Sequence, residues 1–385
     1  MGQLFSLSRI SAGFVAVLVG YTSSAVIIFQ AAAAAGAGPA EISSWLWALG
    51  IGMGLTSIGL SLRFRHPVLT AWSTPGAALL VTSLSGVSMA EAVAVFIFSS
   101  LLVFLCGITG WFEKIMRYVP APLAAAMLAG VLFRFGLDLF LSLQSDLLLV
   151  GAMLTTYLLC RYLAPRYTVP IALLVGVVVA AFAGQLQLGE LSWQLSVPVF
   201  TMPEISLSAL IGIGIPLFIV TMASQNVPGL AVLRANGYRT PASPLISWTG
   251  LTGIVLAPFG GFSYCLAAIT AAICMGKEAD PDPDKRYLAS VYAGFFYLFT
   301  GLFGATVASL FTAFPAPLIM AIAGLALLGT IGNSLAGALA DDIDREAALI
   351  TFLLTASGLT LAGIGSAFWG LLFGLIAYHL KRTFD

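Results

Sequence analysis

The sequence predicts an all-α membrane protein whose chain crosses the bilayer fourteen times, and two observations lead to this fold class. Hydrophobic residues make up 60% of the 385 residues and charged residues only 8%, whereas soluble chains carry about 25% charged residues. All but one of the 16 Lys and Arg residues lie in every second gap between long apolar stretches. Because cytoplasmic loops retain positive charge, this alternation predicts an even number of spans with both termini in the cytoplasm.

The apolar stretches have the lengths of membrane-spanning helices, which need about 20 apolar residues. The first seven predicted segments cover roughly residues 11–32, 44–61, 67–84, 89–111, 120–138, 145–163 and 168–185. The second seven cover roughly residues 206–232, 243–258, 262–276, 286–311, 315–333, 346–362 and 365–380. The longest polar gap, 186–205, separates the two sets and divides the chain almost in half.

The two halves resemble each other. Pro120-Ala121-Pro122-Leu123 recurs as Pro315-Ala316-Pro317-Leu318, an offset of 195 residues that also relates Gln30 to Gln225. Because seven is odd, the second copy must enter the membrane from the opposite face. The sequence therefore predicts a 7+7 inverted repeat, which is typical of secondary transporters that bind their substrate near the midplane.

The third and tenth segments hold corresponding places in the two halves, and both are short and interrupted. His66–Trp72 begins with a proline-containing, β-branched and aromatic run that favours extended backbone, and the run Ser73-Thr74-Pro75-Gly76 then allows a helix to begin. We expect that half-helix to cover residues 77–84. In the tenth segment, residues 258–262 suit an irregular entry, and we expect a half-helix from about Tyr264 to Met275.

Two half-helices of opposite direction would place both N-termini near the middle of the membrane. Their unpaired N–H groups and partial positive charge would suit the carboxylate of a small anion without a buried Lys or Arg. The alternative is that both segments are packing kinks without a ligand.

Candidate substrate contacts lie on or beside these segments. Amide side chains can donate to a carboxylate, although membrane bundles also use them between helices. Aromatic side chains can cover a ring, although they often serve only as packing. The predicted substrate-binding residues are the amides Gln30, Gln225 and Asn226, the aromatic residues Phe29, Trp72, Phe262 and Tyr264, and the half-helix residues Ser73, Thr74, Gly76 and Ser263.

Other kinds of function find little support. The net charge of zero provides no basic face for nucleic acid. The four cysteines lack paired spacing, so neither a metal nor another cofactor is expected. His66 and His379 lie far apart in the sequence without a Ser or Cys partner at useful spacing, which argues against an enzyme.

Three runs resemble the bacterial benzoate/proton symporter (BenE-type) family: Gly20-Tyr21-Thr22-Ser23-Ser24, Thr70–Gly76 and Phe133-Arg134-Phe135-Gly136. The resemblance implies the uracil-permease-like fold, in which substrate lies between the half-helices and faces a gate. It implies a core domain from residues 1–119 and 196–312, and a gate domain from residues 120–195 and 313–385 that is often the contact of a homodimer.

The resemblance also implies a function. We expect a secondary transporter of the bacterial inner membrane, surrounded by lipid, that imports an aromatic carboxylate such as benzoate with protons. Nucleobase relatives carry acidic side chains on spans 8 and 10, whereas the matching positions here, Ser224–Gln225 and Phe262–Ser263, are not acidic. Proton coupling is therefore left without an evident carrier. Alternatives are a carrier of another small anion or nucleobase, and an anion channel.

Overall fold

The computed structural model describes residues 6–112, 120–163, 168–187, 193–277, 279–359, 361 and 366–384. The first half contains α1 (Leu7–Ala34), α2 (Pro39–Phe64), β1 (Thr70–Trp72), α3 (Thr74–Ser83), α4 (Met89–Ile108), α6 (Ala121–Ser145), α7 (Leu147–Leu163) and α8 (Thr168–Phe182). Each of the seven predicted ranges of this half coincides with a helix or with a strand followed by a helix.

The second half follows the same order. It contains α9 (Leu207–Ala209), η3 (Leu210–Gly214), α10 (Ile215–Thr221), η4 (Met222–Asn226), α11 (Val227–Ala235), α12 (Ala242–Leu256), η5 (Ala257–Phe259), β2 (Tyr264–Leu266), α13 (Ile269–Met275), η6 (Pro283–Lys285), α14 (Tyr287–Leu302), α15 (Gly304–Thr312), α16 (Ala316–Ala338), α17 (Arg345–Ala356) and α18 (Ser366–Phe384). Leu207–Arg234 is one long helix with two π-helical turns, η3 and η4.

Six helices in the described residues are long and apolar enough to cross a membrane: α2, α4, α6, Leu207–Arg234, α12 with η5, and α16. Helix α1 becomes a seventh if its two parts, which meet at a bend of 42°, form one span. The predicted membrane protein of apolar helices is thus confirmed. That all fourteen segments cross the bilayer as a 7+7 inverted repeat stays a prediction.

The third and tenth segments are broken, as the sequence predicts. Strands β1 and β2 pair antiparallel, with Thr70 opposite Leu266 and Trp72 opposite Tyr264. The predicted start of the second half-helix at Tyr264 is wrong, because Tyr264–Leu266 pairs with β1 and the helix begins only at Ile269. The hydroxyl cap predicted for the first half-helix is confirmed, but the helix starts at Thr74 and not at residue 77, because the Ser73 side chain is the cap.

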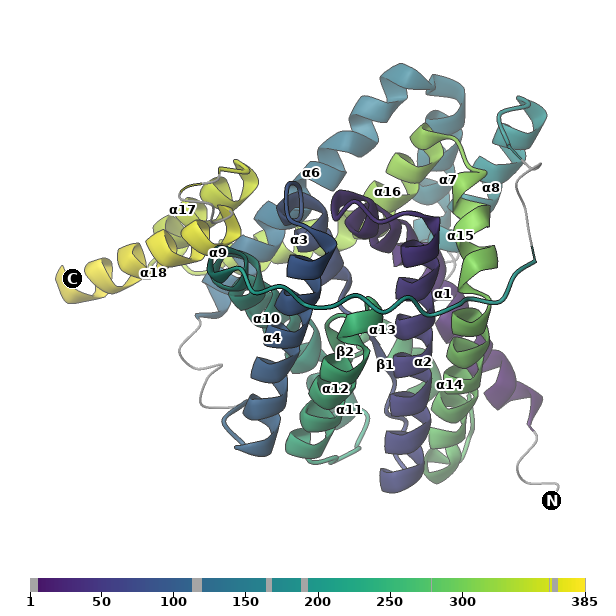
Figure 1. Ribbon diagram of the computed structural model, residues 1–385, viewed down its shortest axis with the longest axis horizontal. Coiled ribbons are helices and arrows are strands. Elements are labelled where there is room, and N and C mark those ends of the chain that lie inside the picture. The colour runs from purple at the N-terminus through teal and green to yellow at the C-terminus, as the bar shows by residue number, and fades with distance from the viewer. Residues whose placement is uncertain are drawn as a thin grey trace.

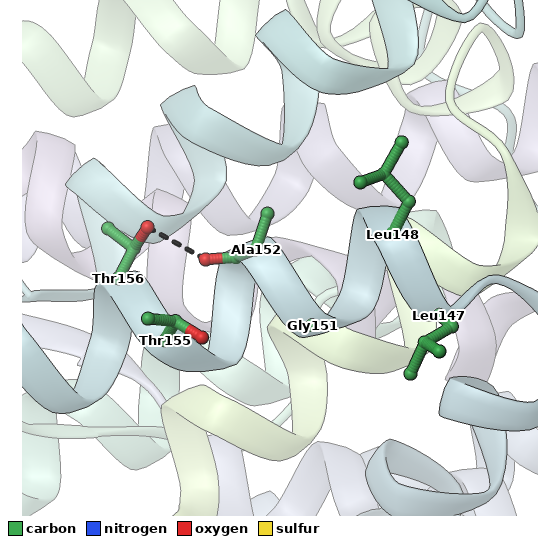
Figure 2. A pocket seen from close by; sticks show the side chains of 6 residues that line it. All are labelled: Leu147, Leu148, Gly151, Ala152, Thr155 and Thr156. Atoms are coloured by element: carbon green, nitrogen blue, oxygen red, sulfur yellow. Dashed lines mark hydrogen bonds between the residues drawn. The ribbon is translucent and has the colours of Figure 1, made fainter.

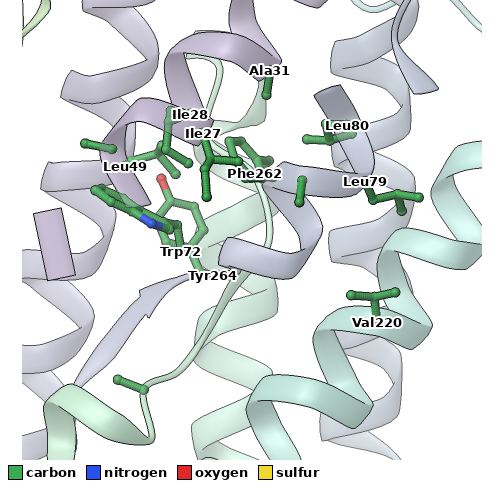
Figure 3. Close-up of a cluster of buried hydrophobic side chains, with 14 of the residues drawn as sticks. Ile27, Ile28, Ala31, Leu49, Trp72, Leu79, Leu80, Val220, Phe262 and Tyr264 are labelled. Carbon is green, nitrogen blue, oxygen red and sulfur yellow. The ribbon is translucent and has the colours of Figure 1, made fainter. Parts of the chain in front are cut away.

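The long helices pack in pairs around this two-stranded ribbon (Figure 1). Helix α2 packs against α14, α12 against α4, and α6 against α16. Beside the ribbon, a cluster of fully buried side chains fills the space between α1, α2 and α3 (Figure 3). It includes Ile28, Leu49, Leu80 and Phe262, none of which is more than 1% exposed.

Candidate functional site

A cavity of about 1060 Å³ lies where the two broken segments meet α6, α8 and α16. Its walls come from α1, from Met53 of α2, from β1 with the start of α3, from η4 with α11, from the start of α13, and from α6, α8, α14 and α16. Its polar side chains are Ser24, Trp72, Thr74, Ser224, Gln225, Thr270, Tyr297, Thr330, Asn333 and Ser334. The walls that α6 and α8 contribute are apolar, through Ala121, Ala124, Ala125, Leu128, Val169 and Pro170.

Three of the residues predicted from the sequence line this cavity: Trp72, Thr74 and Gln225. The Trp72 ring is held in place, since its Nε1 donates to Ser24 Oγ over 2.9 Å and the Tyr21 ring meets it edge-on at 4.8 Å. No hydrogen bond of the Gln225 side chain is found among the described residues. The Gln225 amide is therefore available to a ligand.

Asn226, the neighbour of Gln225, points elsewhere. It is fully buried, its Oδ1 accepts a hydrogen bond from the Leu266 backbone N–H over 2.9 Å, and its Nδ2 lies 3.0 Å from the sulfur of Met222. The π-helical turn of η4 adjoins Pro228, which has no N–H for the Ser224 carbonyl. Asn226 thus anchors the ribbon while Gln225 faces the cavity.

Two more predicted residues, Ser73 and Gly76, bond to each other in the N-terminal cap of α3. Ser73 Oγ accepts the N–H of Gly76 over 3.0 Å, and both residues are buried. A Cβ on Gly76 would lie 2.9 Å from Leu217 Cδ1, so the glycine permits close packing of α3 on α10. Neither residue is among those that line the cavity.

The remaining predicted residues also lie outside the lining. Phe262 packs with Trp45 and Phe96, at ring-centroid distances of 5.7 and 5.4 Å. Tyr264 donates its hydroxyl hydrogen to the Ala48 carbonyl over 2.7 Å. Ser263 is buried in a left-handed conformation, with φ of 43° and no partner for its Oγ within the described structure. Phe29 and Gln30 are half-buried on α1.

The backbone of α13 adds donors to the cavity. Its N-cap residue, Ala268, has no side chain that could cap the helix. The N–H groups of Ile269, Thr270 and Ala271 have no hydrogen-bond partner among the described residues, and Ala268, Ile269 and Thr270 line the cavity. Unpaired N–H groups at a helix start favour anions.

Sequence reasoning missed the polar wall that α16 provides through Thr330, Asn333 and Ser334. Three polar residues within five positions of an otherwise apolar segment were the available signal. It was hard to interpret because they lie close to the predicted end of that segment, where polar residues are ordinary. Their role depends on the packing of α16 against α6.

A second hollow of about 650 Å³ lies along α7 alone, lined by Leu147, Leu148, Gly151, Ala152, Thr155 and Thr156 (Figure 2). The Thr156 hydroxyl donates to the Ala152 carbonyl over 2.8 Å. Because one helix forms its whole wall, this hollow cannot enclose a small molecule as the first cavity does.

The histidine that the structure places nearest the broken segments lies outside the cavity. His66 Nδ1 is 2.6 Å from Thr240 Oγ1, in the loops that precede β1 and α12. Burial lowers the pKa of His66, and the charge of Asp284 opposes this effect. Among the described residues, no group of three or more His, Cys, Asp and Glu side chains could hold a metal ion.

Comparisons with a family model and with known proteins point to the same family. Residues 3–380 match the model of the family described as BenE, benzoate membrane transport protein. The chain is 51% identical over 378 residues to the inner membrane protein YdcO of Escherichia coli K12, covering 98% of this chain and 97% of that protein. It is 43% identical over 378 residues to the benzoate membrane transport protein of Acinetobacter baylyi, covering 98% and 96%. The family resemblance read from the sequence is thereby confirmed.

Solved structures share the fold at low sequence identity. SLC26A9 superposes with a TM-score of 0.69 at 13% identity, covering 98% of this chain and 65% of that one. The transmembrane domain of the cyanobacterial bicarbonate transporter BicA gives a TM-score of 0.60 at 12% identity, covering 96% and 97%. At such identities the likeness establishes the fold alone.

Proposed function

The chain belongs to the benzoate membrane transport protein (BenE) family of membrane transporters, and from this premise we propose that it imports benzoate, or a closely similar aromatic carboxylate, together with protons. The observation that carries the proposal is the cavity between the broken segments and α16. It combines an indole ring, a free amide and a hydroxyl, at Trp72, Gln225 and Thr74, with unpaired backbone donors at the start of α13.

The chemistry of the cavity matches the proposed substrate. Ligand sites are mostly apolar with a few placed polar groups, and here alanines of α6 and the Trp72 ring can contact an aromatic ring. We propose that the Gln225 amide, the Thr74 hydroxyl and the first N–H groups of α13 bind the carboxylate. The other predicted residues, among them Asn226 and Ser73, would hold these groups in place.

The arrangement of helices supports the proposed repeat of fourteen spans. In the proposed repeat, α2 corresponds to α12 and α4 corresponds to α14. The contact of α2 with α14 then has a counterpart in the contact of α12 with α4, and the structure contains both. The same exchange would map β1 onto β2, which pair antiparallel. We therefore propose a core of residues 1–119 and 196–312, and a gate of residues 120–195 and 313–385 that can form a homodimer.

The basic loops give the proposed sidedness. If they are cytoplasmic, α6 and α8 begin at that face, and their first residues Ala121, Val169 and Pro170 line the cavity. The tightly buried cluster that includes Leu80 and Phe262 (Figure 3) would then close the bundle toward the outside. The cavity would then be open to the cytoplasm, one of the two states that alternating access requires.

Purified protein in proteoliposomes tests the function. Labelled benzoate should accumulate when the outside is more acidic than the lumen, and accumulation should stop when the gradient is collapsed; protein-free liposomes are the control. Uptake of a nucleobase or sulfate in place of benzoate would refute the substrate assignment. Steady currents across a planar bilayer at saturating benzoate would instead indicate an anion channel.

A further inference from the structure

The segment that joins the two halves forms an ordered strap. Residues 193–206 form neither helix nor strand and cross in front of the bundle from α15 to α9 (Figure 1). Near its start, the Ser196 N–H donates to the Leu302 carbonyl over 2.8 Å. Ser196 Oγ accepts the N–H of Ala305 over 2.9 Å. The strap therefore begins fixed to the junction of α14 and α15.

Further along, the strap is bonded to three of the candidate spans. Ser44 Oγ of α2 accepts the Val199 N–H and lies 2.9 Å from the Phe259 carbonyl of η5. The Thr201 N–H donates to the Pro258 carbonyl over 2.8 Å, and the Glu204 N–H donates to the Ala90 carbonyl of α4 over 3.0 Å. These backbone donors all turn toward the bundle.

Most large side chains of the strap are exposed, although the Phe200 ring also meets the Phe259 ring of η5 edge-on at 5.7 Å. Six apolar residues are between 59% and 85% exposed: Trp193, Leu195, Val197, Phe200, Met202 and Ile205. A row of this length is unusual on a surface that faces water, because exposed apolar area costs about 25 cal/mol per Å². No Lys or Arg occurs between Arg166 and Arg234, and Glu204 is the one charged residue of the strap, so the row carries little charge that would keep it in solvent.

The row continues the apolar outer faces of the helices it crosses. On α14, Phe295, Phe299 and Leu302 form a stripe that is 43% exposed or more, and the Leu302 carbonyl is bonded to the strap. On α12, Val255 is 59% exposed close to the same level. Faces of this kind contact lipid in a membrane protein, and Trp and Phe are suited to the boundary between head groups and acyl chains.

We propose that residues 193–206 form an interfacial belt that lies in the lipid head-group boundary at the outer ends of the core helices. The outward side chains insert among the first acyl carbons, as the apolar face of an interfacial segment does. The backbone bonds to α2, α4, η5 and the α14–α15 junction hold the belt at that depth. This inference concerns the lipid contact and is independent of the transported substrate.

Cysteine substitution with an environment-sensitive fluorophore tests the belt in lipid nanodiscs. Leu195→Cys and Val197→Cys replace side chains that are 63% and 71% exposed, so both variants should fold. Val255→Cys is the lipid-facing control, and Asp342→Cys, whose side chain is 84% exposed, is the aqueous control. The unsubstituted protein measures labelling of the native cysteines.

Both strap labels should emit at blue-shifted wavelengths and be quenched by spin-labelled acyl chains as strongly as the Val255→Cys label. Emission and quenching like those of Asp342→Cys would show that the strap faces water and would overturn the proposal. Shielding that is insensitive to the lipid quencher and disappears on dilution would point to a second copy of the chain instead, which would equally overturn it.

Discussion

The two broken segments meet in one ribbon, yet they present different chemistry to the cavity. Helix α3 caps itself: Ser73 takes the Gly76 N–H, and Pro75 has none to offer. Helix α13 begins at Ile269 after an N-cap residue, Ala268, that has no capping side chain, and its first N–H groups are unpaired among the described residues. An anion would thus find backbone donors mainly at α13, whereas the sequence predicted that the N-termini of both half-helices would contact it.

The strands are supported in matching ways but by different helices. Thr70 and Leu266 face each other, and their N–H groups point away from the ribbon. The Thr70 N–H donates to Ser57 Oγ of α2, and the Leu266 N–H donates to Asn226 Oδ1 of η4. Because Gln225 and Asn226 lie next to each other in the same π-helical turn, the support of β2 and the lining of the cavity are linked. On the β1 side, Ser57 and its two sequence neighbours lie outside the cavity lining, which α2 reaches one turn away at Met53.

The largest expected effect concerns the turn that leads into β2, which Gly260→Ala should destabilise. Gly260 has φ of 91°, and a Cβ there would overlap the Trp45 ring, which is 2% exposed. Backbone strain and overpacking together should lower the free energy of unfolding by about 3 kcal/mol. Thermal unfolding in detergent, followed by intrinsic fluorescence, measures the loss.

Gly59→Ala is the matched control for that change, since nothing lies within 4 Å of a Cβ at Gly59 on α2. It should leave the unfolding temperature unchanged or raise it slightly, because alanine favours helix by about 1 kcal/mol over glycine. Equal unfolding temperatures for the two variants would contradict the role assigned to the Gly260 turn.

Asn226→Leu should remove the link on the β2 side. The Leu266 N–H would stay buried without an acceptor, which costs about 1–3 kcal/mol. We expect lower thermal stability together with weaker benzoate binding, because the start of α13 follows β2 directly. Ser57→Ala, which removes the acceptor of Thr70, should lower stability with a smaller effect on binding. Equal loss of binding in both variants would refute the difference between the strands.

Gln225→Leu should separate binding from stability. The side chain lines the cavity and makes no hydrogen bond among the described residues, so its loss should weaken benzoate binding about tenfold, or about 1.4 kcal/mol, at an unchanged unfolding temperature. Gln30→Leu is the control, because Gln30 holds the corresponding place in the first half but lies outside the cavity lining. Isothermal titration of both variants decides the matter; a similar loss in Gln30→Leu would contradict the assignment.

These adjacent residues also show what the sequence can and cannot predict. The breaks at Pro67 and at Ser73-Thr74-Pro75 are local backbone effects, so the sequence predicted the broken segments and the half-helices. Whether Gln225 or Asn226 faces the cavity depends on the register of a π-helical turn, which no sequence period reveals. The polar side chains of α16, such as Asn333, reach the cavity only through packing against α6.

Single substitutions can add a capping side chain at the start of α13 or remove the one at the start of α3. Ala268→Ser places an acceptor hydroxyl at the N-cap of α13. Capping requires the backbone there to shift from φ −106° and ψ −61° toward the extended conformation of Ser73, so the gain in stability should stay at about 0.5 kcal/mol while a donor for the proposed carboxylate is occupied. We therefore expect a raised unfolding temperature and a few-fold weaker affinity for benzoate. Ser73→Ala, which uncaps α3, should cost about 1 kcal/mol of stability and leave the affinity unchanged. If Ala268→Ser stabilised the protein without weakening binding, the N–H groups of α13 would not be the donors that hold the carboxylate.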